Sequence, residues 1–356
     1  LTPFFPFLLV CCLPAFAAEP EGETNTAEIT AVRTHAVPDK RKPPRYPRDA
    51  LRRGIEGWVV VQFTITEDGT TDDREIVIAS IDGVFEKAAI NAVSGWTFKP
   101  ATLDGVPVQQ GNRQASLTFR TKRDNATTVS GNFQELYKEA TAAIKDGDLD
   151  TAKEIITQLD ANQKRLLAEV CYLDVLKSVY WQKIGNEKAQ LRYINRALVV
   201  ADKVVKKGVY VNLLRQAIVA SAKAGKYAAA LKNYETLVVV EPELPVDDPV
   251  NKIVSDIKEL LQSNTAIVTE GKIIRCKKCT PPRSSWRHVV LRGRFSVDKV
   301  VGKVSEVEVI CERQSVTLVY DPETVWSIER DWGGCDLRVH GEDGTTFRLV
   351  EHPATG

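Results

Sequence analysis

The chain has 356 residues, of which 43% are apolar and 27% are charged. This length suggests two or three domains, and the composition is ordinary for soluble globular proteins. The formal net charge of +1 gives no electrostatic case for binding nucleic acid or an anionic membrane, and four histidines are a small stock for catalysis or metal binding.

An apolar run near the start of the chain is typical of a secretory signal. It covers residues 4–14, and residues 15–18 are mostly alanines at the spacing of a cleavage site. We expect residues 1–18 to be a signal peptide, residues 19–42 to be a flexible leader, and the protein to lie in the periplasm. An anchor retained in the cytoplasmic membrane is the alternative. The absence of methionine suggests that the true start lies upstream.

Residues 43–121 show the pattern of a small α+β domain. A strand at 58–66 is followed by a glycine turn and a second strand at 74–80. Apolar residues then recur at helical spacing over 85–96, and a third strand follows at 114–121. The order β-β-α-β predicts one helix on a three-stranded antiparallel sheet. The inner face of the first strand is expected to consist of Val59, Val61, Phe63 and Ile65.

Residues 132–263 show a helical period. Asn132 and Glu135 are interpreted as a capping box at the start of the first helix. Gly147, Gly185 and Gly225 each separate two amphipathic stretches, so helix pairs recur every 38 to 40 residues. This α-helical repeat resembles the tetratricopeptide repeat, whose standard length is about 34 residues. An unrelated helical bundle is the alternative.

From residue 265 the apolar period changes to two, which predicts a small all-β domain over 265–356. Cys276 and Cys279 form a C-x-x-C pair in this domain. We expect two disulfides, each joining one member of this pair to Cys311 or Cys335. A structural zinc site and a redox-active C-x-x-C pair are the alternatives. The cysteines concerned are Cys276, Cys279, Cys311 and Cys335. Cys171, on a helical face, is predicted to be a small buried apolar residue.

We find no constellation typical of an enzyme. No serine or aspartate pattern accompanies His288, His340 and His352, and Asp72-Asp73 and Asp247-Asp248 are expected to be solvated turns. The sequence also lacks a glycine-rich phosphate loop and an H-E-x-x-H motif. We therefore expect no catalytic residue, no cofactor and no metal.

Short motifs spread over residues 43–121 resemble the TonB C-terminal family in order and spacing. They are Pro44-Arg45-Tyr46-Pro47, the glycines before the first strand, Trp96-Thr97-Phe98-Lys99-Pro100-Ala101 and Gly105-Val106-Pro107-Val108. The resemblance implies a periplasmic, non-enzymatic protein that contacts TonB-dependent outer-membrane receptors, or other envelope proteins, in transmembrane transport.

The resemblance also implies how contact is made. In this family the module binds the TonB-box segment of a receptor by adding it as a strand to a sheet edge, where backbone N–H and C=O groups are unpaired. Carried over by position, the pairing strand is Gln114-Ala115-Ser116-Leu117-Thr118-Phe119-Arg120, and Arg45-Tyr46-Pro47 lies beside the receptor plug. A purely structural role for Tyr46, Pro47 and Phe119 is the alternative.

Full energy transduction is a second hypothesis, with proton-driven motor proteins of the cytoplasmic membrane as further partners. It requires an anchor and a long spacer, whereas residues 19–42 span only about 80 Å when fully extended. A homodimer formed through the same sheet edges is also compatible with the resemblance. The helical region is expected to offer a surface for a second partner.

Overall fold

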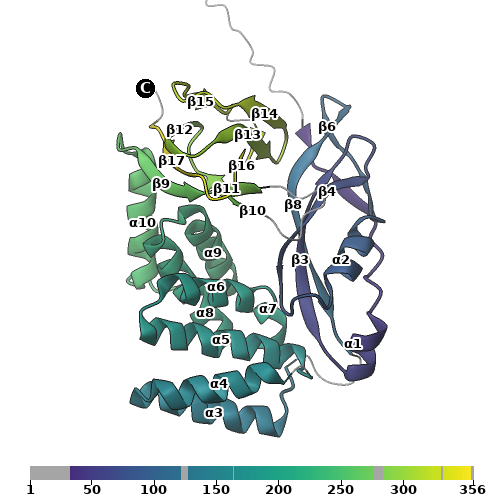
Figure 1. Ribbon diagram of the computed structural model, residues 1–356, viewed down its shortest axis with the longest axis vertical. Helices are drawn as coiled ribbons and strands as arrows, with labels where there is room; N and C mark the ends of the chain where they lie inside the picture. Colours follow the sequence, from purple (N-terminus) through teal and green to yellow (C-terminus); the bar gives the residue numbers. More distant parts are fainter. Residues whose placement is uncertain (1–32, 122–126, 163, 276–283, 330–331, 354–356) are drawn as a thin grey trace, which may run out of the picture.

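The computed structural model describes residues 33–121, 127–162, 164–275, 284–329 and 332–353. Three regions follow one another along the chain: an α+β module, a helical region and a small all-β domain (Figure 1). None of the helices within the described residues is both long and apolar enough to cross a membrane. The predicted signal peptide, residues 1–18, lies outside this part of the chain.

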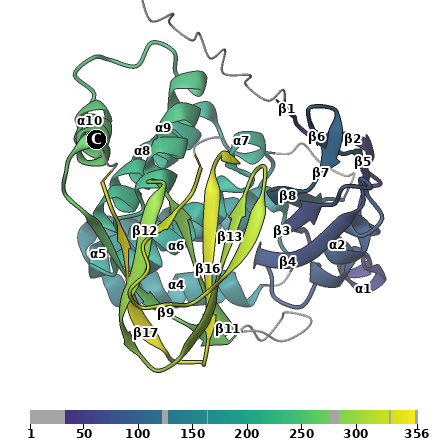
Figure 2. The ribbon, with the colours of Figure 1, turned by 90° about the horizontal axis from the view of Figure 1, so that it is seen from above.

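The α+β module is built on a sheet of three antiparallel strands in the order β4-β3-β8. Helix α2 packs on one face of this sheet, and the other two regions of the chain lie on its opposite side (Figure 2). The predicted β-β-α-β arrangement is thus present, with short strands added between α2 and β8. Its main elements are β3 (Gly57–Ile65), β4 (Thr71–Ala79), α2 (Glu86–Val93) and β8 (Gln110–Phe119).

Part of the predicted leader belongs to this module. Strand β1 (Arg33–Thr34) pairs with β6 (Ala101–Leu103), and β2 (Val37–Lys40) pairs with β5 (Thr97–Lys99). Between β1 and β2 the buried Ala36 donates its N–H to Oε1 of Gln110 at 2.9 Å. The prediction of a flexible leader up to residue 42 is therefore wrong for residues 33–42. Residues 19–32 lie outside the described part.

The helical region contains three helix pairs, as the glycine spacing predicts. The turn of each pair holds a glycine with positive φ, +84° at Gly147, +80° at Gly185 and +67° at Gly225, a conformation that side chains with a Cβ rarely adopt. The tetratricopeptide assignment stays a prediction. The helices are α3 (Gly131–Asp146), α4 (Leu149–Ala161), α5 (Leu167–Ile184), α6 (Glu187–Leu198), α7 (Ala201–Val204), α8 (Lys207–Lys223), α9 (Tyr227–Val240) and α10 (Pro249–Gln262).

The first of these helices begins two residues earlier than predicted. Ser130 is its N-cap, and its Oγ accepts the N–H of Phe133 at 3.4 Å. The Ser130 hydroxyl in turn donates to Oε1 of Glu169 on α5 at 2.6 Å. The predicted capping box of Asn132 and Glu135 is wrong, because a more distant glutamate fixes the cap.

The all-β domain consists of two facing sheets, with the strand orders β10-β11-β16-β13-β14 and β15-β12-β17-β9. Their inner faces share one apolar core that includes Val297, Val307 and Leu337. The strands are β9 (Ile267–Lys272), β10 (Ile274–Arg275), β11 (Ser284–Val290), β12 (Arg294–Val301), β13 (Val304–Cys311), β14 (Ser315–Val319), β15 (Trp326–Ser327), β16 (Cys335–Gly341) and β17 (Thr346–Glu351).

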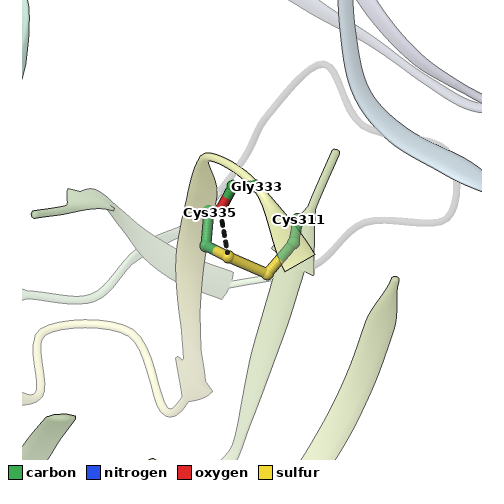
Figure 3. The surroundings of a disulfide bond; sticks show 3 residues. All are labelled: Cys311, Gly333 and Cys335. Carbon is green, nitrogen blue, oxygen red and sulfur yellow. Dashed lines mark hydrogen bonds between the residues drawn. A yellow bond between two sulfur atoms is a disulfide. The ribbon is translucent and has the colours of Figure 1, made fainter. Parts of the chain in front are cut away.

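Cys311 and Cys335 form a disulfide with each other (Figure 3). They face one another directly in the register of β13 and β16. The prediction that each pairs with a member of the C-x-x-C motif is wrong, and a zinc site of four thiolates is overturned with it. Cys276 and Cys279 lie outside the described residues. Cys171 is fully buried beside Ala197, as predicted, and burial raises the pKa of its thiol.

The helical region covers the second face of the module's sheet. Trp58 on β3 has no exposed surface and packs into the core of the helices, while its neighbour Val59 packs into the core under α2. Hydrogen bonds between the module and the helical region also stabilise this contact. Oε2 of Glu56 accepts the N–H of Leu167 at 2.9 Å, and the Arg196 guanidinium donates to the carbonyls of Ala79 and Ser80, both at 2.8 Å. Strand β3 is therefore buried on both faces.

The all-β domain docks on the same sheet through Arg338, whose side chain is 2% exposed. Its guanidinium lies 2.9 Å from Asp73, 3.3 Å from Glu75 and 3.6 Å from Glu308. Asp73 is therefore not the solvated turn residue that the sequence suggested. The same holds for Asp248, which caps α10 and pairs with Arg215 at 2.9 Å. The three regions form one packed unit.

Replacing Trp58 with alanine should lower the free energy of unfolding of the whole chain by about 3–5 kcal/mol, because the indole fills a core shared by two regions. Urea denaturation followed by circular dichroism measures this loss. Val239→Ala, at a side chain that is 78% exposed, is the control and should stay within about 0.5 kcal/mol of the parent. Equal stability of the two variants would contradict the shared core.

Acid should weaken the Arg338 contact. Burial acts to raise the pKa of Glu308, but the hydrogen bond with His340 and the charge of Arg338 outweigh it and hold the pKa below its ordinary 4.5. A lowered pKa contributes stability that is present above the ordinary value and lost as the pH falls through the folded-state value.

We therefore expect Glu308→Gln to cost about 1–3 kcal/mol of unfolding free energy at pH 7. The difference between parent and variant should shrink as the pH falls below 4.5. Urea titrations of both proteins at several pH values measure it. A difference that does not change with pH would show that the Glu308 charge has no part in the contact.

Candidate functional site

Strand β8 lies at an edge of the sheet. Among the described residues β3 is its one ladder partner. In an antiparallel pair alternate residues direct their N–H and C=O groups to the partner strand, and the others direct them away. Strand β8 therefore presents a row of backbone donors and acceptors on its outer side, which is what an added strand needs.

The two ends of β8 differ in exposure. At its start Gly111 is covered by the all-β domain, so closely that an added Cβ would lie 2.6 Å from Cγ2 of Ile310 and 3.0 Å from the carbonyl oxygen of Cys311. From residue 114 onward the side chains on the face away from α2 are exposed, because the helices cover β3 and β4 there but not β8. The open stretch coincides with the predicted pairing residues 114–120.

The seven predicted pairing residues divide into two sets. Gln114, Ser116, Thr118 and Arg120 are exposed. Leu117 and Phe119 are 4% and 2% exposed and belong to the core, and Ala115 packs against that core. The buried residues of this stretch can contact a partner only through their backbone, whereas the exposed residues can also contact it through their side chains.

Tyr46 lies at the end of β8, next to Phe119. Its ring makes edge-to-face contacts with Phe119 at 5.7 Å and Phe85 at 6.0 Å between centroids, and its hydroxyl donates to the carbonyl of Ile55 at 2.6 Å. Burial, with a smaller contribution from the charge of Glu56, raises the pKa of Tyr46 to about 12. Tyr46 therefore stays a neutral donor that fixes the chain at this point.

Pro47 and Arg45 flank this tyrosine and play different parts. Pro47 is the N-cap of α1 (Arg48–Arg53), where its carbonyl accepts the N–H of Leu51 at 2.9 Å. Arg45 is exposed and lines a groove of about 800 Å³ between this segment and α2. Among the described residues that line it, four are basic and none is acidic. The basic ones are Lys42, Arg45, Arg48 and Lys87.

The histidines of the all-β domain have polar partners that the sequence did not indicate. Nε2 of His288 lies 2.9 Å from Oε1 of Glu351, and Nε2 of His352 lies 2.8 Å from Oγ of Ser296. These partners are 63 and 56 residues away in the chain, so spacing could not find them. In the part of the chain that the structure describes, no three His, Cys, Asp or Glu residues are grouped to hold a metal ion.

Residues 42–121 match the family described as Gram-negative bacterial TonB protein C-terminal. This part of the chain is a TonB C-terminal domain. The match includes Arg45-Tyr46-Pro47 and the whole of β8. It covers neither the helical region nor the all-β domain.

Two curated relatives of this TonB domain are proteins named TonB. The one from Pseudomonas aeruginosa is 37% identical over 103 residues, which are 29% of this chain and 27% of that protein. The one from Vibrio cholerae is 34% identical over 83 residues, 23% of this chain and 34% of that protein. The chain therefore spans about a quarter to a third of the length of these relatives.

One solved structure that is similar to the chain is the solution NMR structure of the Pseudomonas aeruginosa TonB CTD. It is 34% identical, the similarity covers 26% of this chain and 92% of that chain, and the TM-score is 0.22.

Replacing Tyr46 with phenylalanine tests the contribution of its hydroxyl hydrogen bond independently of the packing of its ring. The variant keeps the aromatic contacts but leaves the Ile55 carbonyl without its donor, which should cost about 1–3 kcal/mol of unfolding free energy. Urea denaturation measures the cost, with the solvent-exposed Thr118→Ser as control. A Tyr46→Phe variant as stable as the parent would show that this hydroxyl does not fix the fold.

Proposed function

We propose that this chain binds an extended segment of a TonB-dependent outer-membrane receptor, by adding that segment as a strand along residues 114–120, which are the second half of β8 and the residue that follows it. The observation that carries the proposal is the open edge of β8 over this stretch, in a domain of the TonB C-terminal family. Backbone pairing supplies affinity, and the exposed Ser116 and Thr118 side chains on the outer face supply contacts that depend on the partner's sequence.

The basic groove beside Arg45 supports a second contact with the same receptor. It adjoins the Tyr46 end of β8, so a receptor that pairs with β8 presents its neighbouring surface to this groove. Four basic residues without an acidic one among the described lining residues favour an acidic surface there. Mutation of such exposed charges acts mainly on the rate of association.

The location and the other regions belong to the same proposal. A TonB domain suggests the periplasmic face of the envelope, and we place the protein in the periplasm. The helical region, with its tetratricopeptide-like pairs, offers a surface for a second envelope protein. On this hypothesis the chain is a contact protein in transport and not an enzyme.

Calorimetry of the full chain with synthetic peptides tests strand addition. The peptides cover the periplasmic N-terminal segments of the host's outer-membrane receptors. For each peptide that binds, two backbone N-methylated forms are made, one methylated at odd and one at even positions of the pairing segment. Because a paired strand uses every second N–H, one form should lose about tenfold or more in affinity and the other should bind nearly as well as the parent.

Amide hydrogen exchange of the full chain gives the matching readout on the protein. Exchange should slow over residues 114–120, at the end of β8, when the peptide binds, and the internal control is β4 at the opposite edge of the sheet. The strand-addition proposal fails if no receptor peptide binds, if both methylated forms bind alike, or if protection appears in β4 and not in β8.

A further inference from the structure

A cleft of about 610 Å³ lies at the opposite edge of the sheet from β8, between β4 and the helical region. One wall consists of residues 76–82, the end of β4 and the turn that follows it. Because side chains alternate between the two faces of a strand, a wall of consecutive residues means that the cleft runs along the edge of β4 and not along its face. The other wall comes from α4, α5, α6 and the segment before α5.

Basic side chains dominate the helical wall. Four of them line the cleft, against two carboxylates among the described lining residues. The basic residues are Arg165, Lys177, Arg192 and Arg196, and the acidic ones are Asp82 and Asp160. This balance favours an anionic ligand.

Most of these charges are already held in place. Asp160 contacts Lys177 at 2.7 Å and Arg165 at 3.3 Å, and Arg196 is bound by the buried Asp174 at 2.9 Å. Nε of Arg165 is buried and has no hydrogen-bond partner among the described residues, so one donor of this wall is left unused. The wall is therefore a preorganised, positively charged surface.

Arg192 is the exposed cation of this wall. Its guanidinium lies 5.8 Å from the ring centroid of Tyr193, and within the part of the chain that the structure describes it has no carboxylate partner. The Lys177 ammonium lies 5.3 Å from the same ring. Arg192 can thus bind a carboxylate without giving up an existing ion pair.

The edge of β4 adds an apolar element to the cleft. The register places Val60 opposite Ile78 and Val61 opposite Ile76, so Val77 forms a bulge and its side chain is 44% exposed. Beyond the bulge, the carbonyls of Ala79 and Ser80 already accept hydrogen bonds from Arg196, so they are not open to a ligand. The stretch of edge left for a ligand is short and lies over residues 76–78.

We propose that this cleft binds an acidic, extended peptide segment of a partner protein. A carboxylate of the segment pairs with Arg192, an adjacent apolar side chain contacts Val77, and the backbone follows residues 76–78. This site is separate from the receptor contact on β8. One molecule can therefore hold a receptor segment at one edge of the sheet and a second protein at the other.

The test uses the full chain and a capped, fluorescein-labelled hexapeptide of alternating glutamate and valine. The control peptide carries glutamine in place of glutamate. Fluorescence anisotropy at about 50 mM salt, where exposed charges are weakly screened, measures the affinity for both. The glutamate peptide should bind about tenfold or more tightly than the glutamine peptide.

Two charge reversals on the same helix locate the site. Arg192→Glu should weaken binding of the glutamate peptide about tenfold or more, because attraction becomes repulsion. Lys188→Glu, at an exposed position of α6 outside the cleft, makes the same change of net charge and should stay within about twofold of the parent. Neither should change binding of a receptor peptide to β8, so failure of this proposal is distinguishable from failure of strand addition.

Three results would overturn the acidic-peptide site. One is equal binding of the glutamate and glutamine peptides. Another is an equal loss in the two variants, which would show diffuse attraction by net charge. The third is displacement of the peptide by inorganic phosphate, at matched ionic strength, as effectively as by unlabelled glutamate peptide, which would reveal a simple anion site.

Discussion

Burial of β3 on both faces is the constraint on which the rest of the structure depends. Trp58 packs among the helices, and Val59, the next residue, packs under α2. Burying one aromatic side chain of 150–250 Å² contributes roughly 4–6 kcal/mol as an upper bound, at about 25 cal/mol per Å². Part of this is offset, since the Trp58 Nε1 is buried without a hydrogen-bond partner among the described residues. Two cores thus share a single strand, which fixes the helices relative to the sheet.

The sequence predicted the helices and strands better than it predicted which of them pack against one another. Alternation in β3 correctly placed Val59, Val61 and Phe63 under α2, because a strand has a fixed period of two. The same alternation assigned no environment to Trp58 on the other face, although the unbroken apolar run at 58–61 is a signal of burial on both faces. Periodicity identifies a buried face but not what covers it.

The errors have the same origin in long-range contacts. Glu169, not Glu135, fixes the start of α3, and Arg338 binds Asp73, which is only partly exposed. Cys311 pairs with Cys335 because β13 and β16 are neighbours, which spacing alone could not reveal. For the candidate site, the motif located β8 and Tyr46, but the basic groove and the cleft beside β4 need side chains from segments that only the fold brings together.

The contact of Gly111 with Ile310 and Cys311 covers one face of β8 at its start. A segment added along β8 has residues 114–120 available, about 23 Å at roughly 3.3 Å per residue. The disulfide-linked end of β13 lies against the face of β8 at Gly111. On the proposal of strand addition, side chains of a bound segment that lie on this face would meet the all-β domain near Gly111, so this domain would limit how far along β8 the segment extends.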